Sequence, residues 1–549
     1  MTTDAQPESR GQKLLDLVVV GAGVSGIHAV HRALQRGWRV RAFEAGSSVG
    51  GAWYWNRYPG CRVDIEGFEY SYSFSEELQQ EWTWSERYPS QPEVERYLNH
   101  VCDRFGLRSH FTFGTRVESA HFDDVGHCWT LSTDRGETVR AGTLIMATGT
   151  YSQPYRPQFE GLDDFKGLQL RSSSWPKEPV DFTGKRVGLI GTGASGVQIT
   201  PIVAKQAAHL SVLQRTAVYT VPLRNHPADA QRTREIKADY APTREAERVS
   251  AIGFTHLHSR PAPPVTRSAL EVSNEERRRI YEDCWASGGL CFYYTFTDLL
   301  TDPAANRTLE AFFKEKIRSR VSDPRIAELL TPRAEEPALT KRLAGDTGYC
   351  EAMERPNVEL VDLRAEPIRR FTAGGIVVGE REIPLDVIIF ATGFDFGTGA
   401  FSRIDIRGRG GRRLVDEWAH GVRTFLGMMT HGYPNLFWVA GPGSLFYNPM
   451  LNAQYQFHQI ERFLDGRENA DDLVEATAEA VAEWTALHNS IAESTLFTQG
   501  NNYFVGGNVP GKPREVPLFL GGFPLYVEHC DAAARERSCF VAQRRASAA

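Results

Sequence analysis

Two glycine motifs of the same form constrain the fold of this chain more than any other feature of its sequence. The first, Gly-Ala-Gly-Val-Ser-Gly at 21–26, follows a largely apolar run, and the second, Gly-Thr-Gly-Ala-Ser-Gly at 191–196, follows another. Each motif leads into a stretch with helical periodicity, so each indicates a strand, a glycine turn and a helix, the setting of a dinucleotide site. One such motif is a weak indication, but two predict an α/β protein with two Rossmann-like dinucleotide-binding domains.

The glycine turns also indicate which residues approach each dinucleotide. Glycine permits a tight turn and a close approach of the backbone, while the following helix offers free amides and a partial positive charge to a pyrophosphate. Two such sites in one chain suggest that electrons pass from one dinucleotide to the other. The residues expected there are Gly21, Gly23 and Gly26 in the first turn, and Gly191, Thr192, Gly193, Ser195 and Gly196 in the second.

Opposite charges at equivalent places distinguish the two dinucleotides. Glu44 ends the second strand of the first motif, about 20 residues beyond the glycines, where a carboxylate binds ribose hydroxyls. An acid there suits FAD, which has no 2′-phosphate. Arg215 and Thr216 hold the matching place after the second motif, where a guanidinium and a hydroxyl suit the 2′-phosphate of NADPH. Either residue alone would also fit an ordinary surface, but the charge reversal favours FAD in the first site and NADPH, rather than NADH, in the second.

The order of patterns along the chain predicts a discontinuous first domain. Between 225 and 332 the sequence turns charged, helical and rich in proline, which we interpret as a helical insertion or, alternatively, as a separate helical domain. Two strand-like runs both end in Ala-Thr-Gly, at 147–149 and 391–393, where we expect the chain to cross between the nucleotide domains. The predicted parts are an FAD domain at 1–150 and 394–549, an NADP domain at 151–224 and 333–393, and the insertion at 225–332.

Composition excludes several classes of protein. The chain has 549 residues, which is too long for a single compact core, so two or three domains are expected. Its content of 41% hydrophobic and 24% charged residues is that of an ordinary globular protein. Its net charge of −6 argues against a nucleic-acid partner. The polar segment 1–13 does not resemble a secretory signal, and no run is long enough to span a bilayer, so a cytoplasmic enzyme without membrane contact is expected.

Cysteine and histidine patterns argue against metal and dithiol chemistry. The eight cysteines are scattered and none forms a Cys-x-x-Cys pair, which speaks against a disulfide scaffold, a zinc site or a redox-active dithiol. The 15 histidines show no ligand-like clustering, so no metal is expected.

A longer pattern resembles one known family. The stretch 50–64 reads Gly-Gly-x-Trp, four residues, Tyr-Pro-Gly, three residues and Asp, and closely resembles a signature of the type I Baeyer–Villiger monooxygenases. The resemblance covers about 18–526, is weakest in the insertion, and near the C-terminus is greatest to the cyclohexanone monooxygenase branch. It implies that FAD is reduced by NADPH, captures O2 as a C4a-peroxyflavin and converts a ketone to an ester or lactone.

The same resemblance assigns roles to individual residues. It implies that Arg342 stabilises the anionic oxygen species and the adduct, with Asp64 as its orienting carboxylate, and that Lys341 reaches the 2′-phosphate of NADP. Without the family pattern, Lys341-Arg342 would read as a surface basic pair and Asp64 as a turn residue. The further cofactor neighbours expected are Trp53 and Tyr70 at the flavin, Val117 at its adenine and Tyr503 in a mobile loop near NADP.

Two positions depart from the family pattern. Arg171 stands where the fingerprint between the domains, here 165–175, carries histidine. A permanently charged arginine cannot titrate near neutrality, and we interpret this segment as a hinge linker, so Arg171 should affect domain closure more than chemistry. Tyr503 replaces the tryptophan usual in the cyclohexanone-type enzymes, and it keeps an aromatic face.

Alternative functions remain at this stage. An N- or S-oxidising flavin monooxygenase shares both nucleotide folds but normally lacks the 53–64 signature, and a non-catalytic flavoprotein would bind FAD without being reduced by NADPH. The stretch 446–450 (Phe-Tyr-Asn-Pro-Met) is expected to shape the substrate pocket. Branch resemblance favours cyclic aliphatic ketones, and bulkier polycyclic or steroid ketones remain open, as does the oligomeric state.

Overall fold

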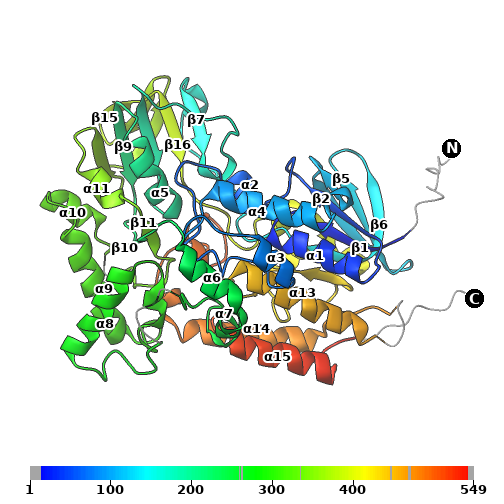
Figure 1. Ribbon diagram of the computed structural model, residues 1–549. Coiled ribbons are helices and arrows are strands. Elements are labelled where there is room, and N and C mark those ends of the chain that lie inside the picture. The colour runs from blue at the N-terminus through cyan, green and yellow to red at the C-terminus, as the bar shows by residue number, and fades with distance from the viewer. Residues whose placement is uncertain are drawn as a thin grey trace, which may run out of the picture.

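The computed structural model describes residues 14–258, 260, 264–333, 335–445, 448–467 and 472–541. The N-terminal segment 1–13, and Phe446 and Tyr447 of the expected substrate pocket, lie outside these ranges. Two sheets stand apart in the molecule, with helices between and below them (Figure 1). Both sheets contain parallel strands followed by glycine turns and helices, so the predicted α/β fold with two Rossmann-like units is confirmed.

The first sheet has eight strands in the order β17-β4-β5-β6-β1-β2-β3, with β18 beside β6. Strands β1, β2, β3, β6 and β18 run parallel, whereas β4 and β5 form an antiparallel meander with β6. Two strands from the C-terminal half thus complete a sheet begun at the N-terminus. The bounds are β1 (Leu15–Val20), β2 (Val40–Glu44), β3 (Phe111–Phe113), β4 (Val117–Asp123), β5 (Cys128–Thr133), β6 (Thr138–Met146), β17 (Asp405–Arg407) and β18 (Leu436–Trp438).

Helices from both chain ends pack around this sheet. Helix α1 follows the first glycine turn and packs against α13 from the C-terminal part, with α15 against α13 in turn. The helices α14 and α15 form the lower edge in Figure 1. The bounds are α1 (Val24–Gln35), α2 (Ala52–Trp55), α3 (Glu76–Glu81), α4 (Gln91–Arg104), α12 (Leu414–Glu417), α13 (Pro449–Asp465), α14 (Ala478–Glu493) and α15 (Phe523–Glu536).

The second sheet has five strands, all parallel, in the order β12-β9-β8-β16-β7. Its central strands are almost wholly apolar and buried, as expected for a parallel sheet covered on both faces. A small antiparallel sheet of β13, β14 and β15 adjoins it. The bounds are β7 (Leu168–Arg171), β8 (Arg186–Ile190), β9 (His209–Gln214), β12 (Val358–Asp362), β13 (Ile368–Thr372), β14 (Gly375–Val378), β15 (Arg381–Pro384), β16 (Val387–Phe390), α5 (Ala194–Val203) and α11 (Tyr349–Met353).

Two adjacent chain segments connect the sheets. One leaves β6 after Met146, the other leaves β16 after Phe390, and they pair antiparallel at Pro154 and Phe394. The amide of Tyr155 donates to the carbonyl of Gly393 at 3.0 Å. The Ala-Thr-Gly endings therefore do lie where the chain passes from one sheet to the other, and the two passages support each other.

The region 225–332 is helical and does not stand alone. It lies between β10 and β11, which pair parallel, and its helix α7 packs against α15. Residues of α8 and α9 belong to the same cluster of buried side chains as both sheets, which argues against a separate helical domain. Where the domain limits fall stays a prediction. The bounds are β10 (Thr220–Pro222), α6 (Ala230–Ala238), α7 (Ala241–Val249), α8 (Asn274–Ser287), α9 (Pro303–Arg318), α10 (Pro324–Leu330) and β11 (Ala344–Asp346).

Short 3-10 helices occupy several connections. Among the helices of the described ranges, none combines the length and apolar character that crossing a bilayer requires. The 3-10 helices are η1 (Arg108–His110), η2 (Leu162–Asp164), η3 (Ser172–Ser174), η4 (Cys291–Tyr294), η5 (Phe401–Arg403), η6 (Arg409–Gly411), η7 (Leu496–Thr498) and η8 (Tyr503–Val505).

Candidate active site

The first glycine turn is built so that only glycine fits. Gly21 has a φ of +112°, and a Cβ at Gly26 would lie 1.9 Å from the carbonyl oxygen of Gly21. Helix α1 begins after Gly23, which has no side chain to cap the helix. The first backbone N–H groups of α1 therefore have no capping side chain and can donate to a ligand. Gly51 packs on this turn, because a Cβ there would come within 2.7 Å of the Gly23 Cα. The turn therefore fits a pyrophosphate bound at a helix N-terminus.

Glu44 fixes the backbone beside that turn. Its two carboxylate oxygens accept hydrogen bonds from the amides of Gly46, at 2.6 Å, and Ala22, at 2.9 Å. The side chain is buried, and burial raises its pKa although the two amides act in the opposite direction. The residue predicted to bind ribose hydroxyls thus also holds the chain in place at the end of β2. Val117, buried at the start of β4, lies next to a β-bulge in the same sheet.

The second glycine turn repeats the first. Gly191 has a φ of +107°, and a Cβ at Gly196 would lie 2.2 Å from the Gly191 carbonyl oxygen. At Gly193, however, no described atom apart from those of Gly193 and its two chain neighbours lies within 4 Å of the place that a Cβ would take, so the turn leaves room for a ligand. The Thr192 hydroxyl donates to the carbonyl of Thr216 at 3.0 Å, which ties the turn to the segment just after β9.

The family-like stretch 50–64 contacts both turns. At its start, the amide of Gly50 donates to the carbonyl of Ala22 at 2.9 Å. At its middle, Tyr58 donates to the side-chain oxygen of Gln198 on α5 at 2.9 Å, and a Cβ at Gly60 would meet the Gln198 carbonyl oxygen at 2.4 Å. This one stretch therefore sets the spacing of the two glycine turns.

The stretch ends in an ion pair. Arg342 donates to both carboxylate oxygens of Asp64, from Nε at 2.5 Å and from Nη2 at 2.6 Å. The side chains are 17% and 24% exposed, so the pair is largely removed from water. Burial alone would lower the pKa of Arg342, but the Asp64 carboxylate outweighs it and raises that pKa above its ordinary value. The guanidinium is therefore a permanent cation held in one plane.

Aromatic side chains surround this pair. The Trp53 indole donates to the Tyr70 hydroxyl at 2.8 Å, with the rings nearly perpendicular at 86°. Burial and the charge of Asp64 raise the pKa of Tyr70, so its hydroxyl stays protonated. The predicted neighbours Trp53, Tyr70, Asp64 and Arg342 thus form one cluster.

Tyr503 reaches the same cluster from the C-terminal part of the chain. The centre of its ring lies 6.4 Å from the centre of the Tyr151 ring. Burial, followed by Tyr151, raises the pKa of Tyr503, and Arg342 is close enough to oppose that rise. The sequence contained no signal for Tyr151 or for Tyr293, which both lie near enough to Arg342 to raise its pKa further.

A second group of cations lies beside the other glycine turn. Lys341 pairs with the buried carboxylate of Glu336 at 2.5 Å. Burial lowers the pKa of Lys341, and the positive charges of Arg364 and Arg215 lower it further. The structure therefore brings Lys341 and Arg215 into one electrostatic environment, and adds Glu336 and Arg364, which sequence reasoning did not single out.

Arg171 lies in the second sheet. Leu168–Arg171 form the edge strand β7, and the Arg171 guanidinium stands 4.7 Å from the centre of the Phe390 ring. Burial and the nearby charge of Arg156 lower the pKa of Arg171. Further along the fingerprint, the Trp175 amide donates to the carbonyl of Trp55 at 3.2 Å, so this segment connects the second sheet to α2.

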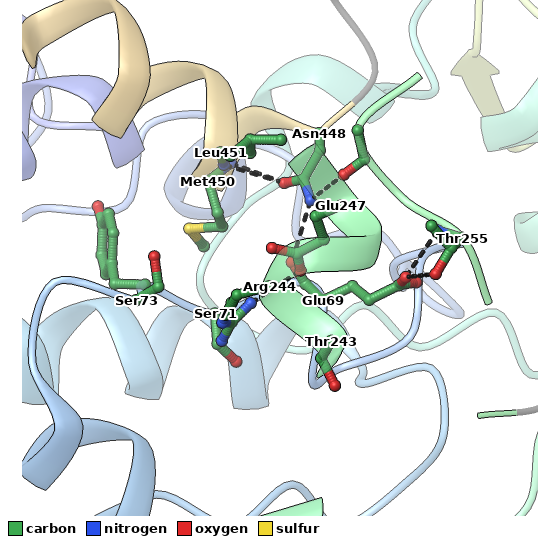
Figure 2. Close-up of polar contacts among 12 residues, drawn as sticks. Glu69, Ser71, Ser73, Thr243, Arg244, Glu247, Thr255, Asn448, Met450 and Leu451 are labelled. Carbon is green, nitrogen blue, oxygen red and sulfur yellow. Dashed lines mark hydrogen bonds and ion pairs between the residues drawn. The ribbon is translucent and has the colours of Figure 1, made fainter. Parts of the chain in front are cut away.

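A buried polar network joins the insertion to the first sheet's helices (Figure 2). The Glu69 carboxylate accepts from the Thr255 amide at 2.6 Å and from its hydroxyl at 2.8 Å. Asn448 caps α13 and donates to the carbonyl of Gly253 at 2.7 Å. The expected pocket residues Asn448 and Met450 are thus buried parts of a framework.

One expectation about histidines is wrong. His256 lies with Glu66 and Glu69 in a group whose ligand atoms are within 4.8 Å of one another. Sequence spacing did not reveal this cluster, because the three residues come from distant segments. Glu66 pairs with Arg87 at 2.8 Å, and Glu69 accepts from the His256 amide at 3.2 Å, so protein groups already engage both carboxylates.

Comparison with known proteins places these features in context. Residues 18–248 match the family model described as pyridine nucleotide-disulphide oxidoreductase. The chain is 40% identical to a Baeyer-Villiger monooxygenase of Pseudooceanicola batsensis, over 95% of each chain. It is 38% identical to the phenazine N-monooxygenase PhzNO1 of Lysobacter antibioticus, over 93% of this chain and 94% of the relative.

Solved structures resemble the whole chain. An oxidised steroid monooxygenase bound to NADP has a TM-score of 0.90 at 47% identity, covering 96% of this chain and 99% of its own. Cyclohexanone monooxygenase from Rhodococcus sp. Phi1 bound to NADP+ has a TM-score of 0.92 at 39% identity, covering 97% and 100%. An OTEMO complex with FAD and NADP has a TM-score of 0.92 at 37% identity, with the same coverage.

Proposed function

The chain belongs to the type I Baeyer–Villiger monooxygenases, and on this premise we propose how its own residues carry out the reaction of that family. The protein uses FAD, NADPH and O2 to convert a ketone into an ester or lactone. The residue assignments rest on one observation, the pair of hydrogen bonds that Arg342 donates to Asp64. Trp53 and Tyr70, joined by a hydrogen bond of their own, belong to the same cluster. The stretch that supplies Asp64 also contacts both glycine turns.

The residues present fit both cofactors. The tight first turn, with Glu44 beside it, suits FAD, and the open space at Gly193 suits the pyrophosphate of NADPH. Held there, FAD would supply the redox chemistry of the reaction, with electrons drawn from NADPH and passed to O2. Trp53 and Tyr70 are proposed to border the flavin, and Val117 to lie near its adenine.

Arg342 is proposed to supply the fixed positive charge of the reaction. Negative charge develops on the carbonyl oxygen as the ketone is attacked, and a cation already in place stabilises it without reorganisation. Asp64 holds the guanidinium plane and offsets the cost of its burial. Because the pKa of Arg342 is raised, the residue donates hydrogen bonds without giving up its proton at working pH.

Lys341, Arg215 and Thr216 are proposed to select NADPH. In the structure Lys341 is held by Glu336, 2.5 Å away, which keeps the ammonium ion paired within a mostly buried site. A 2′-phosphate would offer a second anion to the same ammonium and to the exposed Arg215. Tyr503, whose ring packs near that of Tyr151, is proposed to bring the C-terminal loop against the same site.

Two substrate classes are to be compared, together with one competing reaction. Cyclic aliphatic ketones follow from the similarity to cyclohexanone monooxygenase, and steroid ketones from the 47% identity to a steroid monooxygenase. N-oxidation is the second candidate reaction, because one relative at 38% identity is named a phenazine N-monooxygenase.

The test is a product assay with purified protein, FAD and NADPH. Cyclohexanone, a steroid ketone and a phenazine are supplied separately, and products are separated by mass. Ester or lactone formation from either ketone is expected. Formation of an N-oxide alone, with both ketones recovered unchanged while NADPH is consumed, would contradict the proposed residue roles and favour the alternative.

A further inference from the structure

Lys341 already has a negatively charged partner in the structure. Its ammonium nitrogen lies 2.5 Å from a carboxylate oxygen of Glu336, and the two side chains are 19% and 10% exposed. Charges attract each other more strongly where little water separates and screens them. The ammonium ion to which we assign the 2′-phosphate of NADPH is therefore paired with a carboxylate before the coenzyme arrives.

The segment that carries both residues is fixed to the insertion. The buried side chain of Asn306, on α9, donates to the carbonyl of Ala338 at 2.9 Å and accepts from the Ala338 amide at 3.0 Å. Leu339, next in the chain, has a φ of +67°, a conformation that leucine keeps only where its surroundings enforce it. The fold thus sets the turn between Glu336 and Lys341, and their ion pair is a built feature of the site.

Two arginines belong to the same charged group. Arg215 directly follows β9, and Arg364 lies two residues beyond the end of β12. The two strands are parallel neighbours, so both arginines come at the same edge of the second sheet. Both are exposed, and their positive charges lower the pKa of Lys341. Glu336 therefore places a negative charge among three cations.

A carboxylate in this place has opposite consequences for the two nicotinamide coenzymes. The 2′-phosphate of NADPH is an anion, and it must share the Lys341 ammonium ion with Glu336 or displace the carboxylate. Like charges brought close together weaken binding. NADH carries a ribose hydroxyl at the same position, which a carboxylate does not repel and from which it can accept a hydrogen bond.

We propose that Glu336 limits the preference of this enzyme for NADPH over NADH by competing with the 2′-phosphate for Lys341. The proposal rests on the role proposed above for Lys341, and it adds an opposing group to the cations that favour the phosphate. The preference is then the difference between attraction by these cations and competition by Glu336. Removal of the carboxylate alone should increase it.

The test measures binding without turnover. Holoenzyme with oxidised FAD is titrated in a calorimeter with NADP+ and, separately, with NAD+, and the result is expressed as the ratio Kd(NAD+)/Kd(NADP+). Glu336→Gln keeps the size of the side chain and removes its charge, so we expect this ratio to rise roughly tenfold. The rise should come from tighter binding of NADP+, with Kd for NAD+ changed by less than about twofold.

The neighbouring Glu335 provides a matched control. Its side chain is exposed, so Glu335→Gln removes the same formal charge from a place where water and salt screen it. This variant should change the ratio by less than about twofold. Glu336→Asp withdraws the carboxylate from Lys341 by one methylene group and should raise the ratio less than Glu336→Gln does. It carries the test where Glu336→Gln does not fold with FAD.

A variant of Lys341 shows whether Glu336 acts through the lysine. In Lys341→Ala the buried carboxylate has lost its paired cation and binds a proton more readily, so it carries less charge. Adding Glu336→Gln to Lys341→Ala should then change the ratio by less than about twofold. A purely structural role of Glu336 would give the same change with and without the lysine.

Three outcomes would overturn the proposal. They are an unchanged or lower ratio in Glu336→Gln, an equal rise in Glu335→Gln, and an equal rise with and without Lys341. A lower ratio would mean that Glu336 holds Lys341 in place for the phosphate and does not compete with it. The role proposed for Lys341 fails separately, if Lys341→Ala alone leaves the ratio unchanged. Because the titrations need no ketone, they are also independent of the product assay.

Discussion

The replacement of Arg342 by alanine tests the proposed mechanism most directly. Arg342 makes two hydrogen bonds to Asp64, and its side chain is 17% exposed, so the variant loses a preorganised cation that bulk water does not replace in kind. Removing one such group costs a factor of roughly 10² to 10³ in turnover, about 3–4 kcal/mol of transition-state stabilisation. We expect Arg342→Ala to keep FAD and to be reduced by NADPH, but to form almost no ester or lactone.

The partner residue supplies the control. Asp64→Asn has nearly the same shape, but it removes the negative charge and turns one acceptor into a donor that faces the guanidinium. Product formation by Asp64→Asn should therefore fall by about tenfold or somewhat more. This loss is smaller than that of Arg342→Ala, because the cation remains but is no longer held in its plane. Arg342→Lys keeps the charge without the two-point contact and should resemble Asp64→Asn.

The double variant of Asp64 and Arg342 decides whether Asp64 acts through Arg342. If it does, the double variant is no worse than Arg342→Ala alone, within about 0.5 kcal/mol. The assay has two parts: anaerobic bleaching of the flavin band by NADPH, and product yield per NADPH consumed. Normal product formation by Arg342→Ala, or a double variant whose loss is the sum of the two single losses, would refute the reasoning.

Three other predictions follow from the structure. Lys341→Ala should reduce the preference for NADPH over NADH in kcat/KM by about tenfold, roughly 1.4 kcal/mol, and an unchanged ratio would show that Lys341 does not contact the 2′-phosphate. Tyr503 packs its ring against Tyr151, Phe396 and Phe504. Tyr503→Ala removes that ring, so KM for NADPH should rise a few-fold with normal FAD content, whereas Tyr503→Phe keeps the ring and should stay near wild type; equal effects of the two variants would count against the packing role. Burial raises the pKa of Glu247 to about 8, so the folded state binds its proton more tightly than the unfolded state does, and this contribution to stability falls as pH rises from about 4.5 to 8. Glu247→Gln should flatten thermal unfolding curves over that range relative to wild type, and an unaltered pH dependence would contradict the shift.

Motifs with a local physical reason predicted most of the fold and part of the site. The glycine turns could be located because φ above +100° and close backbone contacts at Gly21 and Gly191 admit only glycine. The meeting of Arg342 with Asp64 could be expected only from the family pattern, since nothing in the composition or spacing of the chain joins segments so far apart.

The residues that sequence analysis missed share one property. Tyr151, Tyr293 and Glu336 gain their roles from contacts across the fold, and each would be an ordinary core or surface residue in its own segment. Arg171 also gains meaning only in the fold, where its guanidinium lies over the Phe390 ring at the edge of the second sheet.

The stretch 50–64 has a consequence for any attempt to rebuild this enzyme from parts. Within fifteen consecutive positions, its first glycines pack against one nucleotide unit, Tyr58 and Gly60 contact the other, and Asp64 orients the Arg342 guanidinium. A chimaera that imports a foreign NADP unit must therefore carry a helix whose surface at the position of Gln198 matches Tyr58 and Gly60. Without that match, the misfit would displace the short segment 50–64 and, with it, Asp64 and the Arg342 guanidinium. Exchange of the NADP unit would then lower activity even where both nucleotide units fold.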